Sequence, residues 1–264
     1  MAVEGLDKFI DYLSGHRSAF VLIGGTACDI WFSEQNLSFR ATKDLDIVLI
    51  LEKINAAFIS QFWALIRDGQ YQIKNRSEGE SPVLYRFERP MAEGFPFKVE
   101  LFCRSNPGLD IGTDQRITPI RMEDAQSLSA ILLHDSYYHF LTEHCRESRG
   151  IVAADAVALI PLKIRAWLDL TARKARGEMV GERDLKKHRH DVFRLALLLP
   201  DDQTIALPDE LAEDVTAFIN RHPADHADWD AIRNAIRSTV GGTIQPSALL
   251  AAIQSYYQIG ATIK

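Results

Sequence analysis

The stretch from Phe20 to Ile50, FVLIGGTACDIWFSEQNLSFRATKDLDIVLI, decides which fold this chain can adopt. Its first four residues, Phe20–Ile23, form a continuous apolar run, which is typical of a short strand covered on both faces. A Gly-Gly turn, a short amphipathic segment and a polar loop follow. They lead to a second strand, which carries two aspartates, Asp44 and Asp46. We therefore expect a strand, a glycine turn, a helix and an acidic strand in that order.

The acidic strand is expected over Asp44–Leu51, where side chains alternate between two faces. Asp44 and Asp46 share one face, and the opposite face is apolar, with Leu45, Ile47, Leu49 and Leu51. Two ionised carboxylates this close repel each other unless a cation neutralises them. Hard oxygen ligands in this arrangement suit Mg²⁺, usually together with substrate phosphates. Taken alone, an ordinary acidic pair at the start of a strand explains these two residues equally well.

A third acid is expected on the strand Phe97–Cys103. Its apolar face carries Phe97, Val99, Leu101 and Cys103, and Lys98, Glu100 and Phe102 lie opposite. Glu100 is the one acid on that opposite face. A carboxylate there would complete a two-metal site for in-line displacement at phosphorus.

The glycine turn strengthens the interpretation of the acidic strand as a functional site. Backbone N–H groups at Gly24 and Gly25 can approach phosphate oxygens closely, because glycine has no side chain in the way. Thr26 is placed to cap a helix over residues 27–32. A lone Gly-Gly pair is usually a plain turn, but its position before an Asp-x-Asp strand is far more specific.

Hydrophobic periodicity predicts the remaining elements. In the first part we expect helices over 6–13 and 54–66 and strands over 71–73 and 83–87. A break at Ser105–Gly108 follows, and beyond it we expect helices over 123–147, 155–176, 184–199, 208–220, 228–238 and 246–258. The fold class is therefore α/β (α+β), with a small mixed-sheet domain over 1–115 and an all-helical domain over 116–264.

Composition is that of a globular protein, with 47% hydrophobic and 25% charged residues. The N-terminal sequence MAVEGLDKFIDYL contains acidic residues and does not resemble a secretory signal. No apolar run approaches the ~20 residues that span a bilayer. Three widely spaced cysteines, Cys28, Cys103 and Cys145, indicate buried thiols in a reducing cytoplasm.

Charge is unevenly distributed along the chain. The segment Lys163–Arg194 holds ten Lys/Arg against five Asp/Glu, a net of +5, which leaves −11 for the rest because the whole chain carries −6. Such asymmetry is a sign that one surface meets phosphate, although a solvated helical face explains it more simply.

The motifs IGGTACDIWF and FRATKDLDIVL resemble the first motif of the DNA polymerase β-type nucleotidyltransferase superfamily. The Arg-x-Thr-x-Asp-x-Asp form, Arg40 to Asp46, resembles its AbiEii toxin-like branch. The resemblance implies a nucleotidyltransferase domain in which Gly24, Gly25 and Thr26 hold the triphosphate. It also implies that Asp44 and Asp46 hold the metal ions, and Glu100 stands where the superfamily often has a third acid.

The resemblance continues into the helical half and spans roughly residues 20–200. ALIPLKIRAWLDL offers Lys163 as a cation for the triphosphate, and ERDLKKHRHDVFRL offers Asp184 and Asp191. Asp184 is more simply an N-cap, so Asp191 is the better match to the family's helical acid. A snorkelling side chain is an equally good interpretation of Lys163.

Other charged residues near these motifs have two interpretations. Arg40 and Lys43 could contact the nucleotide or balance the charge of the acidic pair. His188 and His190 are two residues apart on a helix and point to different sides, which argues against a shared metal.

The resemblance implies Mg²⁺- (or Mn²⁺-) dependent transfer of a nucleoside monophosphate from an NTP to a hydroxyl acceptor. The acceptor would be an RNA, such as the 3′ end of a tRNA, and an antitoxin protein would be the partner of this cytoplasmic, toxin-like enzyme. One alternative is a small-molecule nucleotidyltransferase of the antibiotic-modifying type, which the acidic composition suits. Another is a catalytically silent nucleotide- or RNA-binding module, against which the intact Asp44 and Asp46 argue.

Overall fold

The computed structural model describes residues 3–73, 85–104, 117–120 and 128–260. These residues form two compact units. The first, called the sheet unit, comprises Met1–Ile30 and Ala41–Ala154, and the second, called the helical unit, comprises Trp31–Arg40 and Asp155–Lys264. The helical unit therefore includes a ten-residue segment that immediately precedes the acidic strand in the sequence.

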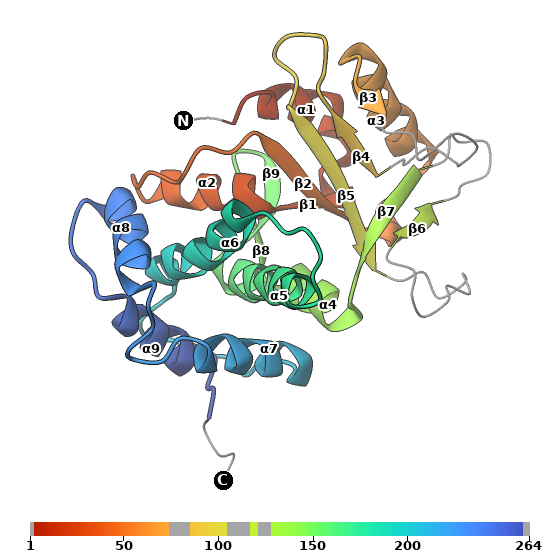
Figure 1. The fold of residues 1–264 in the computed structure, drawn as a ribbon. Coiled ribbons are helices and arrows are strands. Elements are labelled where there is room, and N and C mark those ends of the chain that lie inside the picture. The colour runs from red at the N-terminus through yellow and green to blue at the C-terminus, as the bar shows by residue number, and fades with distance from the viewer. Residues whose placement is uncertain (1–2, 74–84, 105–116, 121–127, 261–264) are drawn as a thin grey trace. The chain divides into compact units, whose positions relative to one another are not determined.

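The described part of the sheet unit is built on nine strands (Figure 1). They are β1 (Phe20–Ile23), β2 (Asp44–Leu49), β3 (Gln72–Ile73), β4 (Arg86–Glu88), β5 (Lys98–Arg104), β6 (Ile117–Ile120), β7 (Leu128–Leu133), β8 (Cys145–Ser148) and β9 (Ile151–Ala154). Their order is β3-β4-β5-β2-β1-β9-β8, with β7 beside β5 and β6 beside β7. The sheet is mixed, because β2 runs parallel to β5 and antiparallel to β1.

Helices of the sheet unit bury its aromatic core. These are α1 (Leu6–Tyr12), α3 (Ala56–Asp68) and α4 (Asp135–Glu143), the short 3₁₀ turns η1 (Ser14–Ala19) and η2 (Leu51–Lys53), and α2 (Gly24–Glu34), which continues into the helical unit. Phe62 of α3 meets Phe87 of β4 edge-on, with ring centroids 5.5 Å apart. Phe9 of α1 meets Phe20 of β1 in the same way at 5.3 Å. Burying each such ring contributes roughly 1.5–3 kcal/mol.

The helical unit packs its own core. It contains α5 (Ala156–Ala175), α6 (Glu182–Leu195), the 3₁₀ turn η3 (Ala196–Leu198), α7 (Asp209–Asn220), α8 (Trp229–Val240) and α9 (Pro246–Tyr256). Asp155 caps α5 by accepting from the N–H of Val157 at 2.9 Å. Phe193 of α6 lies between Phe218 of α7 and Trp229 of α8, with both centroid distances 5.8 Å. These rings hold three helices together.

Most of the predicted elements are confirmed. β1 and the five helices α5 to α9 begin and end within a few residues of the predicted bounds. α1 and α3 also form where the periodicity predicts them. In β2, Leu45, Ile47 and Leu49 are buried while Asp44 and Asp46 are partly exposed, so the predicted alternation is confirmed.

The prediction of one helix over 123–147 is wrong where it can be compared. β7, α4 and β8 occupy Leu128–Ser148, and residues 123–127 lie outside the described residues. The run LSAILL is apolar except for Ser129, and periodicity alone cannot distinguish a strand from a helix in so short an apolar run. The predicted domain boundary at 115/116 lies outside the described residues, as do Ser105–Gly108 and residues 83–84 of a predicted strand, and it stays a prediction.

Two predicted caps are also wrong. α2 starts at Gly24, so Thr26 lies inside its first turn instead of before it. α6 has Gly181 at its N-cap, and Asp184 lies in the first turn. Among the described residues, no helix is both long and apolar enough to cross a membrane.

Candidate functional site

The parallel pairing of β2 with β5 sets the geometry of the acidic strand. Asp44 pairs with Lys98, and Asp46 pairs with Glu100. On the other side of β5, Arg86 of β4 pairs with Glu100. Side chains of paired residues project to the same face of a sheet. These five residues form what we call the acidic face, and they include all three acids predicted from the sequence.

Ion pairs connect the acidic face. The Lys98 ammonium lies 2.6 Å from Glu100 Oε2 and 3.0 Å from Asp44 Oδ2. Arg86 donates to the other oxygen of Glu100, Oε1, from Nε at 2.7 Å and from its terminal nitrogen at 2.6 Å. Both oxygens of Glu100 are therefore engaged by cations.

Lys98 is held in its charged form. Burial lowers the pKa of its ammonium, but the charge and hydrogen bond of Glu100, with Asp46 and Asp44, raise that pKa above the ordinary value of 10.5. Lys98 is thus a permanent positive charge on the acidic face.

Gly24 lies directly against Asp46. A Cβ on Gly24 would lie 2.1 Å from Asp46 Oδ2, and the residue has φ +70°, a conformation that side chains disfavour. Thr26 is fully buried, and its hydroxyl donates to the carbonyl oxygen of Asp44 at 2.7 Å. The glycine turn and the start of α2 are therefore fitted to the acidic strand, and Thr26 fixes the strand's first residue.

The donor set of the acidic face fits one divalent ion held partly by substrate. Among the residues that the structure describes, no group of three or more His, Cys, Asp or Glu could hold a metal ion. Glu100 binds Arg86 and Lys98, so Asp44 and Asp46 are the residues that would hold such an ion. Two carboxylates completed by phosphate and water oxygens are an ordinary set for Mg²⁺.

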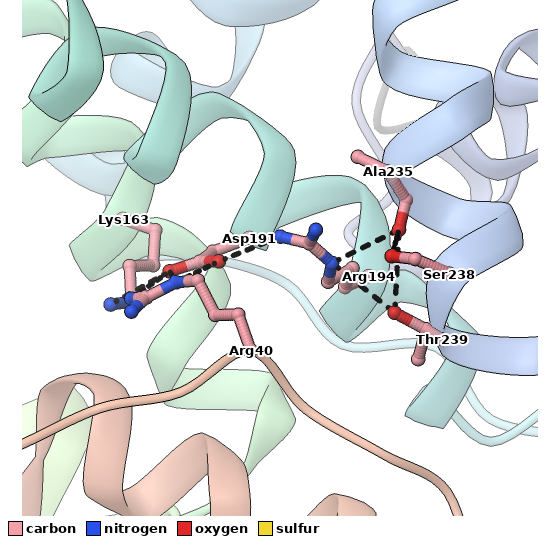
Figure 2. A network of polar contacts seen from close by, with 7 residues as sticks. All are labelled: Arg40, Lys163, Asp191, Arg194, Ala235, Ser238 and Thr239. Carbon is pink, nitrogen blue, oxygen red and sulfur yellow. Dashed lines mark hydrogen bonds and ion pairs between the residues drawn. The ribbon is translucent and has the colours of Figure 1, made fainter.

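A second charged group, which we call the Asp191 cluster, lies in the helical unit and contains Arg40, Lys163, Asp191 and Arg194 (Figure 2). Asp191 is fully buried. Arg40 donates to both of its oxygens, at 2.9 Å from Nε to Oδ1 and 2.7 Å from its terminal nitrogen to Oδ2. The Lys163 ammonium lies 3.4 Å from Oδ2 and Arg194 lies 3.2 Å from Oδ1.

Three cations keep the buried Asp191 ionised. Burial raises the pKa of Asp191, but the charges of Lys163, Arg40 and Arg194 and the Arg40 hydrogen bonds outweigh it and lower that pKa to about 2. Arg194 also donates from Nε to Thr239 Oγ1 and to the Ala235 carbonyl oxygen of α8, both at 3.2 Å (Figure 2). The Asp191 cluster thus ties α5, α6, α8 and the segment before the acidic strand into one unit.

Two histidines on α6, His188 and His190, precede Asp191 in the sequence, and both are neutral at physiological pH. Burial and the charge of Lys163 lower the pKa of His188 to about 3. Burial and the charge of Arg189 lower the pKa of His190 to about 4. One ring nitrogen of each, Nδ1 of His188 and Nε2 of His190, is buried without a hydrogen-bond partner.

The basic segment Lys163–Arg194 is largely neutralised within the helical unit. Besides Lys163 and Arg194, which bind Asp191, five basic side chains form ion pairs: Arg165 with Asp214, Arg173 and Arg176 with Glu178, Lys174 with Glu182, and Arg189 with Asp228. At least seven of its ten cations are therefore paired, which weakens the expectation of a broad basic surface for nucleic acid.

Comparison with known protein families assigns the chain. Residues 9–241 match the family described as nucleotidyl transferase AbiEii toxin, type IV toxin–antitoxin system. This chain belongs to the AbiEii family. As an AbiEii-family member it is a nucleotidyltransferase of the toxin type, and the resemblance inferred from the Arg-x-Thr-x-Asp-x-Asp motif is confirmed.

Solved structures provide more distant likenesses to this AbiEii-family chain. The crystal structure of JHP933 from Helicobacter pylori is 14% identical, with a TM-score of 0.40 over 96% of this chain and 90% of that one. A candidate nucleotidyltransferase, also from H. pylori, is 14% identical, with a TM-score of 0.31 over 96% and 93% of the two chains. No curated protein matches this chain.

The structure thus places the predicted site residues of this AbiEii-family chain in two groups. Gly24, Gly25, Thr26, Asp44, Asp46 and Glu100 belong to the sheet unit, and Arg40, Lys163 and Asp191 belong to the helical unit. Sequence reasoning missed Lys98, Arg86 and Arg194 as partners of these acids. Lys98 lies on the same strand face as Glu100, and Arg194 is three residues from Asp191 on one helix. The sequence therefore indicated both as possible partners of these acids. It did not indicate Arg86, because only the pairing of β4 with β5 places it.

Proposed function

We propose that this chain transfers a nucleoside monophosphate from an NTP to a hydroxyl acceptor with the help of Mg²⁺ or Mn²⁺. The observation that carries the proposal is the fit of Gly24 against Asp46, on a strand face where Asp44 and Asp46 lie side by side. Because Gly24 has no Cβ, the carboxylate of Asp46 can lie against the first turn of α2, where backbone N–H groups can meet a phosphate. Asp44 and Asp46 would hold the divalent ion, which supplies Lewis acidity to the phosphate oxygens.

The reaction is a substitution at the α-phosphorus. The acceptor oxygen forms a bond to Pα while the bond from Pα to the bridging oxygen of Pβ breaks, and pyrophosphate leaves. Asp46 is placed to accept the hydroxyl proton, since Glu100 is engaged by Arg86 and Lys98. Positioning and electrostatics supply most of such a rate enhancement.

The Asp191 cluster supports a phosphate-binding role in the helical unit. Three cations surround the carboxylate of Asp191, an arrangement that a phosphate oxygen could join. Lys163 lies farther from Asp191, at 3.4 Å, than Arg40 or Arg194 does, and we propose that it binds phosphate oxygens. Arg40, with two short bonds to Asp191, would hold that carboxylate in place instead of contacting nucleotide directly.

The acceptor that we propose first is the 3′ end of an RNA such as tRNA, with an antitoxin protein as the partner that restrains the enzyme. Membership of a toxin–antitoxin family supports this choice. The internally paired basic segment and the net charge of −6 favour a second candidate, a small cationic acceptor.

The test is incubation with each NTP, labelled on its α-phosphate, in the presence of Mg²⁺ and either total RNA or small hydroxyl acceptors. Label that reaches RNA, and that disappears for Asp46→Asn, is the expected result. Label on a small acceptor and not on RNA would favour the small cationic acceptor over the RNA 3′ end. Bound NTP with no transfer to any acceptor would contradict the enzymatic proposal.

A further inference from the structure

On the acidic face, Lys98 binds a carboxylate that a metal ion would also bind. Its ammonium bridges Asp44 Oδ2 at 3.0 Å and Glu100 Oε2 at 2.6 Å. The parallel register of β2 and β5 brings these residues side by side, because Lys98 pairs with Asp44 and Glu100 pairs with Asp46. A protein cation is therefore bound to one of the two carboxylates that we assign to the metal.

Glu100 is held differently from the two aspartates. Arg86 binds its Oε1 and Lys98 binds its Oε2, so each oxygen has a cationic partner supplied by a neighbouring side chain. Its side chain is also the most buried acid of the face, at 9% exposure against 30% for Asp44. Glu100 thus has the surroundings of an internal counter-charge and lacks those of a metal ligand.

Two cations cannot share Asp44 without repelling each other. A divalent ion that approaches Asp44 and Asp46 therefore meets the Lys98 ammonium on the same carboxylate. Lys98 has a second, shorter contact to Glu100, which can retain it when the contact to Asp44 is lost.

We propose that Lys98 is a positioning residue that neutralises the Asp44–Asp46 pair in the metal-free protein, and that divalent metal displaces it from Asp44 onto Glu100. This inference rests on the proposed function, because it takes Asp44 and Asp46 as the metal ligands. It assigns Glu100 to Lys98 and Arg86, and it makes Lys98 a determinant of metal affinity.

The experiment measures Mn²⁺ binding to the full chain without nucleotide, by loss of the electron paramagnetic resonance signal of free Mn²⁺. Lys98→Met removes the competing cation from Asp44. We expect its dissociation constant to fall about tenfold relative to the wild type, since a charge-assisted hydrogen bond contributes on the order of that factor.

Arg86→Met is the matched control. It removes one positive charge from the same face, but the ion pairs of Arg86 are with Glu100 and Glu88, whereas Lys98 pairs with Asp44. A general change of electrostatic field would act similarly in both variants, whereas direct competition acts only in Lys98→Met. Lys98→Gln, which can still hydrogen-bond Glu100, provides a second substitution if the Met variant does not fold by circular dichroism.

The outcomes separate this inference from the proposed function. Tighter Mn²⁺ binding in the Lys98 variants than in Arg86→Met supports the inference. Equal changes in both, unchanged affinity or weaker affinity in the Lys98 variants overturns it while leaving the metal site intact. Absence of Mn²⁺ binding that depends on Asp46, tested with Asp46→Asn, overturns the metal site itself and the inference with it.

Discussion

The acidic face and the Asp191 cluster have opposite ratios of acidic to basic side chains. On the acidic face, three carboxylates share two cations, Lys98 and Arg86. In the Asp191 cluster, three cations share a single carboxylate. Among these residues, carboxylates outnumber cations on the acidic face, and cations outnumber carboxylates in the Asp191 cluster.

The difference shows what each group is suited to bind. A buried charge is tolerated only where partners offset its desolvation. The acidic face can be completed by a cation, and the Asp191 cluster can be completed by an anion such as phosphate. In each group one residue of the minority charge, Lys98 or Asp191, organises the others. Four predictions test this contrast.

Substitution of Asp191 should have the largest effect on stability. Asp191→Ala leaves Arg40, Lys163 and Arg194 without their common partner, and removal of one member of a buried ion pair typically costs about 3–5 kcal/mol. The free energy of unfolding, measured with urea, should fall by about this amount. Asp184→Ala on the same helix, which removes an exposed first-turn acid, should lower it by less than about 1 kcal/mol. Similar losses in both variants would show that the Asp191 cluster does not organise the helical unit.

Asp46 and Lys163 should be required for activity more than for stability. Asp46→Asn and Lys163→Met each remove a charge that we assign to ligand binding, and each should lower nucleotidyl transfer by roughly 10²–10³-fold. The Lys163→Met protein should keep its unfolding free energy within about 1 kcal/mol, because Asp191 retains Arg40 and Arg194. If Lys163→Met lowers the unfolding free energy as much as Asp191→Ala does, the role of Lys163 is structural.

The contact of Gly24 with Asp46 should affect transfer activity more than the backbone conformation of Gly24 does. Gly24→Ala places a Cβ 2.1 Å from Asp46 Oδ2 and strains a residue at φ +70°, a conformation that costs an L-residue about 1–2 kcal/mol. Gly177→Ala is the matched control, since Gly177 has φ +82° and no atom within 4 Å of the added Cβ. Both should lose similar stability in thermal unfolding, and only Gly24→Ala should also lose transfer activity. Equal activity of the two variants would show that Gly24 has no specific role in the candidate site.

Acid should weaken the helical unit through its neutral histidines. Burial lowers the pKa values of His188, His190 and His222 to about 3, 4 and 4 from 6.5, so the unfolded chain binds more protons below pH 6.5. Stability is therefore full above pH 6.5 and falls as the pH decreases toward 4, by at most about 1.4 kcal/mol per pH unit for each histidine. His222→Phe should flatten the dependence of unfolding free energy on pH by up to one histidine's share. An unchanged slope would mean that His222 contributes nothing to it.

Much of the acidic face could be predicted from the sequence, because strand alternation is a local property. Asp44, Asp46 and Glu100 were placed on matching faces by parity alone, and the structure has them there. The contact of Lys98 with Asp44 depends on the register of β2 against β5, which no local pattern specifies. β7 was missed for a related reason, since a strand inside an apolar run is defined by the neighbour it pairs with.

The Asp191 cluster could be predicted only as separate residues. Lys163 and Asp191 were singled out by family resemblance, whereas Arg40 was assigned to nucleotide and Arg194 was overlooked. Arg40 and Asp191 are 151 positions apart, so their bidentate contact depends on how the segment before β2 packs within the helical unit.

The sequence by itself determined the order of elements, the glycine turn before an Asp-x-Asp strand, and the membership of a nucleotidyltransferase family. These features follow from periodicity and residue chemistry over short distances along the chain. Only the tertiary structure decided which cation neutralises which acid: Lys98 and Arg86 on the acidic face, and Arg40, Lys163 and Arg194 around Asp191. Ion pairs of this kind depend on strand register and helix packing, which bring together residues that the sequence keeps far apart.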